Sequence, residues 1–217
     1  MNKSKRFGGW LAVIIILAIL IIDQTIKISV KTTMTLGEAQ RVFDWFYIEF
    51  IENNGMAYGM TFFNKIVLSL FRSVAICVIG WYIYKVVRKG TFSLGYVVCL
   101  SMVLAGAAGN LVDCMFYGQM FNASTPFTVS HFVPFGDGYA PFMYGKVVDM
   151  FYFPIINTTW PEWMPWCGGN SFVFFSPVFN FADACITVGV AALLLFFRKD
   201  LEHLSAAYTK DNANSNS

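Results

Sequence analysis

Thirteen consecutive residues near the start of the chain, Trp10 to Ile22, carry no polar side chain. Three further apolar stretches follow, at Ile66–Tyr84, Phe92–Val112 and Val178–Phe197. A soluble domain of 217 residues, 57% of them apolar, has no core large enough to bury so much apolar surface. Because about 20 apolar residues cross a bilayer as a helix, we expect an all-α membrane protein with four transmembrane helices, at about residues 7–27, 66–87, 92–113 and 178–197.

The basic residues before the first stretch allow a second interpretation, a cleaved signal peptide. Lys3, Lys5 and Arg6 would form its positive n-region. However, the residues after the apolar run, Asp23-Gln24-Thr25, are not a small-x-small cleavage site. We therefore expect an uncleaved anchor helix.

Basic residues also orient the predicted spans. They cluster in the N-terminal tail, after the second span and after the fourth span, at Lys3, Lys5, Arg6, Lys85, Arg88, Lys89, Arg198 and Lys199. Segment 114–177, by contrast, carries a single cation, Lys146. Because cytoplasmic loops are enriched in Lys and Arg, both termini are predicted to be cytoplasmic, with outer loops at 28–65 and 114–177. The polar tail 203–217 is predicted to be disordered.

The outer loops carry more than connecting residues. Val42–Glu52 is rich in aromatic and β-branched residues with partial alternation, which predicts a strand. Segment 114–177 is too long for a simple connection and predicts a lid or a small subdomain. Its tryptophans, Trp160, Trp163 and Trp166, suit either the membrane interface or packing within the loop. We expect residues 1–202 to form a single membrane domain with this small extracytoplasmic, β-containing region.

Carboxylates inside apolar spans are costly and usually functional. The predicted topology places three of them, Asp23, Asp113 and Asp183, toward the outer side of the membrane. In two cases an amide precedes the carboxylate by three residues, Asn110 before Asp113 and Asn180 before Asp183, so that amide and carboxylate would share a helix face. The alternative is that each carboxylate only bonds a neighbouring helix. Three carboxylates on one side favour a functional site.

These residues limit the chemistry. No predicted span contains a His, no H-E-x-x-H motif occurs, and the five Cys form no disulfide framework, so we predict neither a metal site nor a cofactor. A serine mechanism would need a nearby His. A carboxylate pair sharing one proton remains: the ionised member takes a proton from water, and the protonated member donates to the scissile amide. From topology alone, Asp113 and Asp183 would form this pair.

Five motifs occur in order along the chain: Asp23-Gln-Thr-Ile-Lys27, Asn53-Asn-Gly55-Met-Ala-Tyr-Gly59, Gly109-Asn110-Leu-Val-Asp113, Val147-Val-Asp149-Met-Phe151 and Phe179-Asn180-Phe-Ala-Asp183. Together they closely resemble bacterial lipoprotein signal peptidase (signal peptidase II). The resemblance implies an intramembrane aspartic endopeptidase that cuts diacylglyceryl-modified prolipoproteins just before the lipidated Cys. It also implies a monomer in the bacterial cytoplasmic (inner) membrane, an active site facing the periplasm, and inhibition by globomycin-type compounds.

The resemblance assigns the catalytic pair to Asp149 and Asp183, in place of the pair that topology favours. Asp149 lies in the outer loop, so residues 145–156 are expected to fold back to the outer end of the fourth span, with Gly145 helping the turn. The remaining motif positions would orient the pair or bind substrate backbone and lipid headgroup: Asp23, Lys27, Asn53, Gly55, Asn110, Asp113 and Asn180.

The chain departs from the family pattern in two places. Cys114 follows Asp113 where the family usually has Arg, so a headgroup or carboxylate contact is expected from elsewhere, with Lys146 or Arg72 as candidates. Residues 115–144 resemble an insertion, either decoration or a lid over the lipid-binding cleft. Cys114 and Cys167 are both predicted to lie outside, where a disulfide bridge would require suitable geometry.

Two other functions fit part of the sequence. Intramembrane carboxylates also relay protons in small transporters, although four spans without an inverted repeat are unlike a transporter. A non-enzymatic membrane scaffold would use the carboxylates only to hold helices together. No basic stripe suggests nucleic acid, and the predicted partners are prolipoproteins and membrane lipid.

Overall fold

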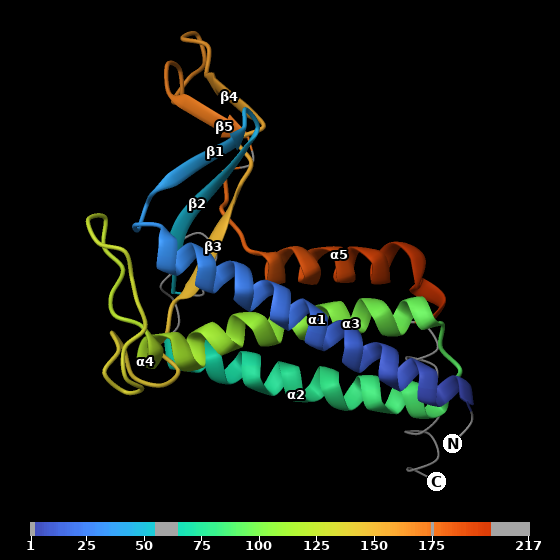
Figure 1. Cartoon of the computed structure of the whole chain (residues 1–217). Helices are drawn as coiled ribbons and strands as arrows, with labels where there is room; N and C mark the ends of the chain where they lie inside the picture. The colour runs from blue at the N-terminus through green and yellow to red at the C-terminus, as the bar shows by residue number, and fades with distance from the viewer. Residues whose placement is uncertain (1–2, 55–64, 175, 201–217) are drawn as a thin grey trace. The chain divides into compact units, whose positions relative to one another are not determined.

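The computed structural model describes residues 3–54, 65–174 and 176–200 (Figure 1). The chain divides into two compact units, each assembled from separate stretches of sequence. Of the described residues, the helical unit comprises 3–23, 70–111 and 182–200, and the sheet unit comprises 24–54, 65–69, 112–174 and 176–181. Gly55 and the predicted tail 203–217 lie outside the described residues.

Four apolar helices supply the helical unit: α1 (Lys3–Thr33), α2 (Lys65–Lys89), α3 (Leu94–Val112) and α5 (Phe181–Phe196). The end of α1 after Asp23 belongs to the sheet unit. Buried side chains from all four helices form one core, which includes Ala12, Ile83, Val86, Tyr96, Leu100 and Leu193.

Three helices are long and apolar enough to cross a membrane: Arg6–Thr33, Lys65–Lys89 and Leu94–Met120. The third is longer than predicted, because α3 continues through a π-helical turn (η2, Asp113–Tyr117) into α4 (Gly118–Met120). The first residues of the predicted insertion are therefore helical. α5 has 16 residues, about 24 Å at 1.5 Å per residue, whereas the hydrocarbon core is about 30 Å thick. The fourth span stays a prediction.

The outward helix faces are apolar. On α2, Phe71, Val74, Val78 and Trp81 recur at three- and four-residue spacing and are 57–70% exposed. α1 has a similar exposed row, formed by Ile14, Leu17 and Ile21. Continuous apolar faces of this kind mark contact with lipid or with a partner, and three helices of spanning length make lipid the natural surroundings.

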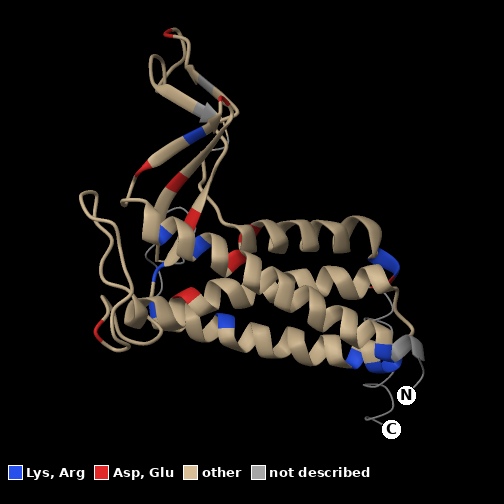
Figure 2. Cartoon of the chain, in the orientation of Figure 1, with Lys and Arg blue, Asp and Glu red and all other residues tan. Residues whose placement is uncertain are grey.

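Basic side chains gather at one end of the helical unit, where α1 begins and where α2 and α5 end (Figure 2). They are Arg6, Lys85, Arg88, Lys89, Arg198 and Lys199. Two contacts join the residues after α5 to the start of α3: Ser93 Oγ donates to Asp200 at 3.0 Å, and Phe197 packs against Tyr96. The charge separation on which the predicted membrane orientation depends is therefore present within this unit.

The helices α3 and α5 approach closely at Gly106, where an added Cβ would lie 2.4 Å from the carbonyl oxygen of Ala182. We expect Gly106→Ala to lower the thermal unfolding midpoint in detergent, because overpacking such a contact costs about 1–3 kcal/mol. Gly80→Ala is a matched control on α2, since a Cβ there would meet only Leu104, at 4.0 Å. It should be neutral or stabilising. Equal midpoints for the two variants would contradict the close packing.

The sheet unit contains a three-stranded antiparallel sheet in the order β1 (Ala39–Phe43), β2 (Phe46–Asn53), β3 (Val147–Tyr152). The single strand predicted over 42–52 is instead part of a hairpin, because Asp44 and Trp45 form a turn within it. A second hairpin joins β4 (Ile156–Thr159) to β5 (Ser171–Phe174). The core packs the end of α1 against the sheet and residues after α3, through Val30, Met34, Phe50, Tyr117, Phe121 and Met150.

Residues 145–156 fold back toward the start of α5, as predicted. Phe151 and Phe179 exchange two backbone hydrogen bonds, of 2.7 and 3.1 Å. Asp149, however, lies on β3 and not in a loop, because this segment pairs with β2. Gly145 also serves a different purpose from the one expected. It does not adopt a positive φ, but a Cβ there would lie 2.1 Å from the carbonyl oxygen of Asp113. It permits a close backbone approach.

Candidate active site

Asp149 is held by two amide side chains. It is 3% exposed. Its Oδ1 accepts a hydrogen bond from Asn180 Nδ2 at 2.7 Å, and its Oδ2 accepts one from Asn53 Nδ2 at 3.2 Å. Asn53 ends β2, the strand paired with β3, and Asn180 directly precedes α5. Three of the sequence motifs therefore meet at this carboxylate.

Asp113 connects α1 to β3. Its Oδ2 lies 2.8 Å from Lys27 Nζ, in an ion pair whose two side chains are both fully buried. Gln24 Nε2 donates to Oδ1 at 2.9 Å, and the backbone N–H of Val148 donates to Oδ2 at 3.2 Å. Because Val148 immediately precedes Asp149, Asp113 fixes the strand that carries that carboxylate. A positioning role for Asp113 stays a prediction.

A second group of carboxylates lies in the helical unit. Asp183, half-buried in the first turn of α5, accepts a hydrogen bond from Asn110 Nδ2 at 2.7 Å. Asp23 is fully buried and accepts the backbone N–H of Ala182 at 3.0 Å, which satisfies one of the donors that a helix N-terminus leaves without a helical partner. Gly109 makes room for it, since a Cβ there would lie 2.6 Å from Asp23 Oδ2. Asp23 therefore anchors the start of α5.

The amides of the two N-x-x-D motifs bond carboxylates of other motifs. From sequence spacing, Asn110 was expected to assist Asp113, and Asn180 to assist Asp183. The structure shows Asn110 bonded to Asp183, and Asn180 bonded to Asp149. Asn180 precedes the first residue of α5, so the rule that places residues three apart on one helix face does not apply to it. Neither amide therefore bonds the carboxylate of its own motif in these two hydrogen bonds.

The predicted site residues thus fall into two groups. The sheet unit brings together Lys27, Asn53, Asp113, Asp149 and Asn180, and the helical unit brings together Asp23, Asn110 and Asp183. Gly55 lies outside the described residues. The pairing of Asp149 with Asp183 stays a prediction at this point.

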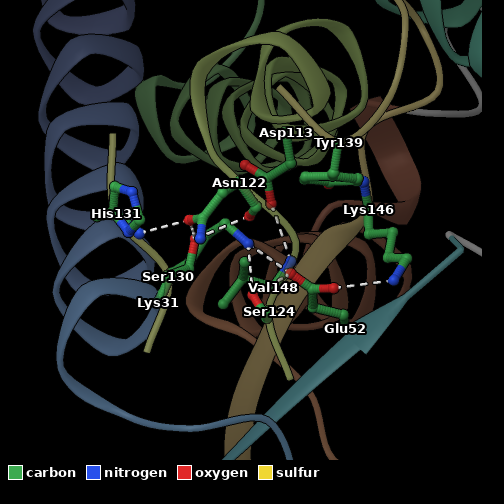
Figure 3. A network of polar contacts seen from close by, with 10 residues as sticks. All are labelled: Lys31, Glu52, Asp113, Asn122, Ser124, Ser130, His131, Tyr139, Lys146 and Val148. Atoms are coloured by element: carbon green, nitrogen blue, oxygen red, sulfur yellow. Dashed lines mark hydrogen bonds and ion pairs between the residues drawn. The ribbon is translucent and has the colours of Figure 1, made fainter. Parts of the chain in front are cut away.

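A buried polar network that the sequence did not predict lies beside Asp113 (Figure 3). Glu52 Oε1 accepts hydrogen bonds from Lys31 Nζ and, at 2.8 Å, from Ser124 Oγ. Its Oε2 accepts one from Lys146 Nζ at 3.0 Å. Since Glu52 pairs with Val148 in the sheet register, the network stabilises the same strand pair that carries Asn53 and Asp149.

Residues of the predicted insertion 115–144 complete this network. Lys31 is fully buried, and its Nζ lies 5.2 Å from the ring centroids of both Phe121 and Tyr139, within the range of a cation–π interaction. Ser124 also accepts a hydrogen bond from Lys31, at 2.8 Å. The insertion is thus packed into the sheet unit, and a role as a lid stays a prediction.

One sequence signal could have located part of the network. Asp23, Lys27 and Lys31 recur every four residues, which places them along one face of α1. The two lysines in an apolar helix are as unusual as the carboxylates. The partners gave no local signal, because Glu52 and Ser124 lie 21 and 93 residues from Lys31 in the sequence.

The ionisation of Glu52 links this network to pH. Burial alone would raise the pKa of Glu52, but the charge of Lys31 and hydrogen bonds from Lys31, Lys146 and Ser124 outweigh it and hold the pKa below its usual 4.5. A carboxyl group whose pKa is lower in the folded state than in the unfolded state stabilises the protein at pH values above its unfolded-state pKa. This stabilisation is lost as the pH falls through the folded-state pKa. We expect the unfolding midpoint of wild type to fall more steeply below pH 4.5 than that of Glu52→Gln. Parallel midpoint-against-pH curves would contradict this assignment.

Lys146 makes a carboxylate contact, with Glu52, and its role in place of the family Arg stays a prediction. Cys114 and Cys167 are both free thiols, so the disulfide considered above is not formed. Among the described residues, no group of three or more His, Cys, Asp or Glu side chains could hold a metal ion.

Comparisons with known proteins agree with the motif pattern. Residues 15–198 match the family model described as signal peptidase (SPase) II. A lipoprotein signal peptidase of Porphyromonas gingivalis is 45% identical over 93% of this chain and 88% of its own length. One from Amoebophilus asiaticus is 34% identical over 93% of this chain and 81% of its own length.

Solved structures share the fold. Two structures of a bacterial membrane enzyme, determined by the in meso method at 2.3 and 1.9 Å, align with TM-scores of 0.58 and 0.57. They cover 88% and 87% of this chain, and 90% and 93% of their own chains, at 22% identity. At this identity the likeness shows a common fold alone.

Proposed function

The chain belongs to the signal peptidase II family of aspartic peptidases, and we propose that it removes signal peptides from diacylglyceryl-modified prolipoproteins, cutting just before the lipidated Cys. The observation that carries this proposal is the pair of amide-held carboxylates. Asn53 and Asn180 bond Asp149, and Asn110 bonds Asp183. Membership of a peptidase family disfavours the alternatives of a transporter or a scaffold.

Asp149 and Asp183 form the catalytic pair in this proposal. Asn180 supports the pairing, because it bonds Asp149 and lies only three residues before Asp183. At no more than about 3.6 Å per residue, the chain keeps the Cα atoms of Asn180 and Asp183 within about 11 Å. The four-residue segment 180–183 therefore bonds Asp149 at one end and carries Asp183 at the other.

The two carboxylates divide the proton transfers. The ionised one removes a proton from a water molecule, whose oxygen attacks the scissile carbonyl carbon. The protonated one donates its proton to the amide nitrogen as the C–N bond breaks, so that one proton is taken up and one is released. Amide side chains suit this site because their N–H groups orient carboxylate oxygens without adding charge. Asp113, Lys27 and Asp23 hold the elements that carry the pair.

The site would face the outer side of a bacterial inner membrane, with both termini cytoplasmic and α5 as a fourth span. Within the helical unit, Asp183 lies in the first turn of α5, and Arg198 follows the other end of that helix. The basic end is the cytoplasmic one by the charge bias of membrane proteins. In this orientation the site meets the membrane-anchored substrate. The proposed enzyme acts as a monomer and is inhibited by globomycin-type compounds.

Lipid on the substrate should control the reaction. The purified protein is expected to cleave a diacylglyceryl-modified prolipoprotein and to leave the unmodified precursor uncut, because each buried methylene contributes about 0.8 kcal/mol to binding. The shift in mobility on a gel measures cleavage. Equal kcat/KM for the two substrates would overturn the lipid requirement, and Asp149→Asn with the modified substrate controls for contaminating proteases.

A further inference from the structure

A concave site lies in the helical unit, between α1, α2 and α3. It is an open groove of about 530 Å³, and its lining includes Arg6, Gly9, Trp10, Ile83, Arg88 and Leu104. That volume is in the range of small-molecule sites. The lining is apolar except at the end where α1 begins and α2 ends, where the two arginines lie. The groove contains none of the residues of the candidate active site.

Two glycines keep the groove open. Gly9 on α1 and Gly80 on α2 both line it. A Cβ added at Gly9 would approach Val87 no closer than 3.5 Å, and one at Gly80 would approach Leu104 no closer than 4.0 Å. The space beside these glycines is therefore not needed for close helix packing, in contrast to Gly106, and it can hold part of a ligand.

The arginines give the groove a charged end. Arg6 is exposed. Arg88 Nη1 donates to Tyr84 Oη at 2.8 Å, and its guanidinium lies over the Tyr84 ring, 5.5 Å from the centroid. This contact holds one cation at the groove, and Lys85 and Lys89 lie within three residues of Arg88 in the sequence. An anionic head and an apolar tail would complement the two ends of the groove.

We propose that this groove binds one anionic glycerophospholipid, with an acyl chain against the apolar lining and the phosphate between Arg6 and Arg88. Basic pockets between transmembrane helices at the cytoplasmic side bind anionic headgroups. A zwitterionic lipid would bring the cation of its own headgroup close to the two arginines, which would repel it. The basic n-region of a signal peptide would be repelled by them. The site goes beyond the proposed peptidase reaction and is separate from its residues.

Competition between lipids tests the proposal. The full chain, purified in detergent, would be mixed with equal amounts of phosphatidylglycerol and phosphatidylcholine of the same acyl chains, and retained lipid would be counted by native mass spectrometry. Because the headgroup of phosphatidylglycerol is net negative and that of phosphatidylcholine is net neutral, two cations at the headgroup predict a preference for phosphatidylglycerol of roughly 30-fold. Arg6→Gln/Arg88→Gln should abolish this preference. Arg198→Gln/Lys199→Gln, which removes the same charge from the same end outside the groove, should keep it.

Other outcomes would overturn the proposal. Equal retention of the two lipids by wild type would exclude an anionic site, and equal loss in both double variants would show diffuse attraction only. Gly80→Leu fills the groove without changing charge and should reduce retention of phosphatidylglycerol, so the test stands even if the arginine variant fails to fold. Unchanged retention in Gly80→Leu, or displacement of the lipid by a basic transmembrane peptide, would contradict lipid as the occupant.

Discussion

Lys27→Met is expected to lower the free energy of unfolding by about 3–5 kcal/mol, because it leaves a buried carboxylate without its cation. Lys27 Nζ lies 2.8 Å from Asp113 Oδ2, and neither side chain is exposed. Two other donors to Asp113, Gln24 and the N–H of Val148, are neutral and do not replace the charge of Lys27. Since Val148 adjoins Asp149, the loss should also reduce peptidase activity. Unfolding in detergent, followed by circular dichroism, measures the change.

A double-mutant cycle separates the ion pair from simple loss of side-chain packing. Lys27→Met/Asp113→Asn removes both charges and keeps an oxygen at position 113 as an acceptor, so it should be markedly more stable than Lys27→Met alone. Lys146→Met is the matched single control, because Lys146 is 36% exposed and its partner Glu52 keeps Lys31. It should change stability by less than about 1 kcal/mol. Equal effects of Lys27→Met and Lys146→Met would contradict the assignment.

Asp149→Asn and Asp183→Asn should each reduce cleavage of a diacylglyceryl-modified prolipoprotein by roughly 10²–10⁴-fold, the usual contribution of a general acid or base. Each substitution preserves the size of the side chain and removes the group that accepts or donates the proton. The measurement is kcat on the purified variants, whose unfolding midpoints are compared with wild type. Asp137→Asn, an exposed carboxylate of the sheet unit, is the matched control and should retain full activity.

The same set of variants distinguishes the two possible pairs. Topology in the sequence favoured Asp113 with Asp183, whereas the family motifs select Asp149 with Asp183. Asp113→Asn is expected to lose stability and to retain some activity when folded. Full activity in Asp149→Asn, together with none in folded Asp113→Asn, would return the catalytic role to Asp113.

The sequence located the four apolar helices, because long apolar stretches carry a strong and local signal, but α1 continues to Thr33, past the predicted end at residue 27. It placed the end of the third helix at Asp113, whereas η2 and α4 extend it to Met120 through a largely apolar segment that contains no proline. The hairpin at β1 and β2 was missed for a similar reason: Asp44-Trp45 lacks a glycine that would mark the turn.

The sequence selected the residues of the candidate site but did not predict their contacts. Motif order selected Asp23, Asn53, Asp113, Asp149 and Asn180, all of which are in bonded clusters. The choice of carboxylate that each amide bonds depends on how backbone segments that are distant in the sequence are placed relative to one another. Glu52 illustrates the limit most clearly, because it joins Lys31, Ser124 and Lys146 only after β2, α1 and the insertion have packed.

Asp149 and Asp183 are proposed to act at one site, and short-range cross-linking tests this pairing most directly. The variant Asp149→Cys/Asp183→Cys would be made in a background from which the five native cysteines have been removed, and treated with a short bifunctional thiol reagent. Asn53→Cys/Asp149→Cys and Asn110→Cys/Asp183→Cys are positive controls, since their parent side chains are hydrogen-bonded at 3.2 and 2.7 Å. We predict intramolecular cross-linking of the Asp149→Cys/Asp183→Cys variant as complete as in the controls. If the controls cross-link and the Asp149→Cys/Asp183→Cys variant does not, the proposed pairing of Asp149 with Asp183 is contradicted.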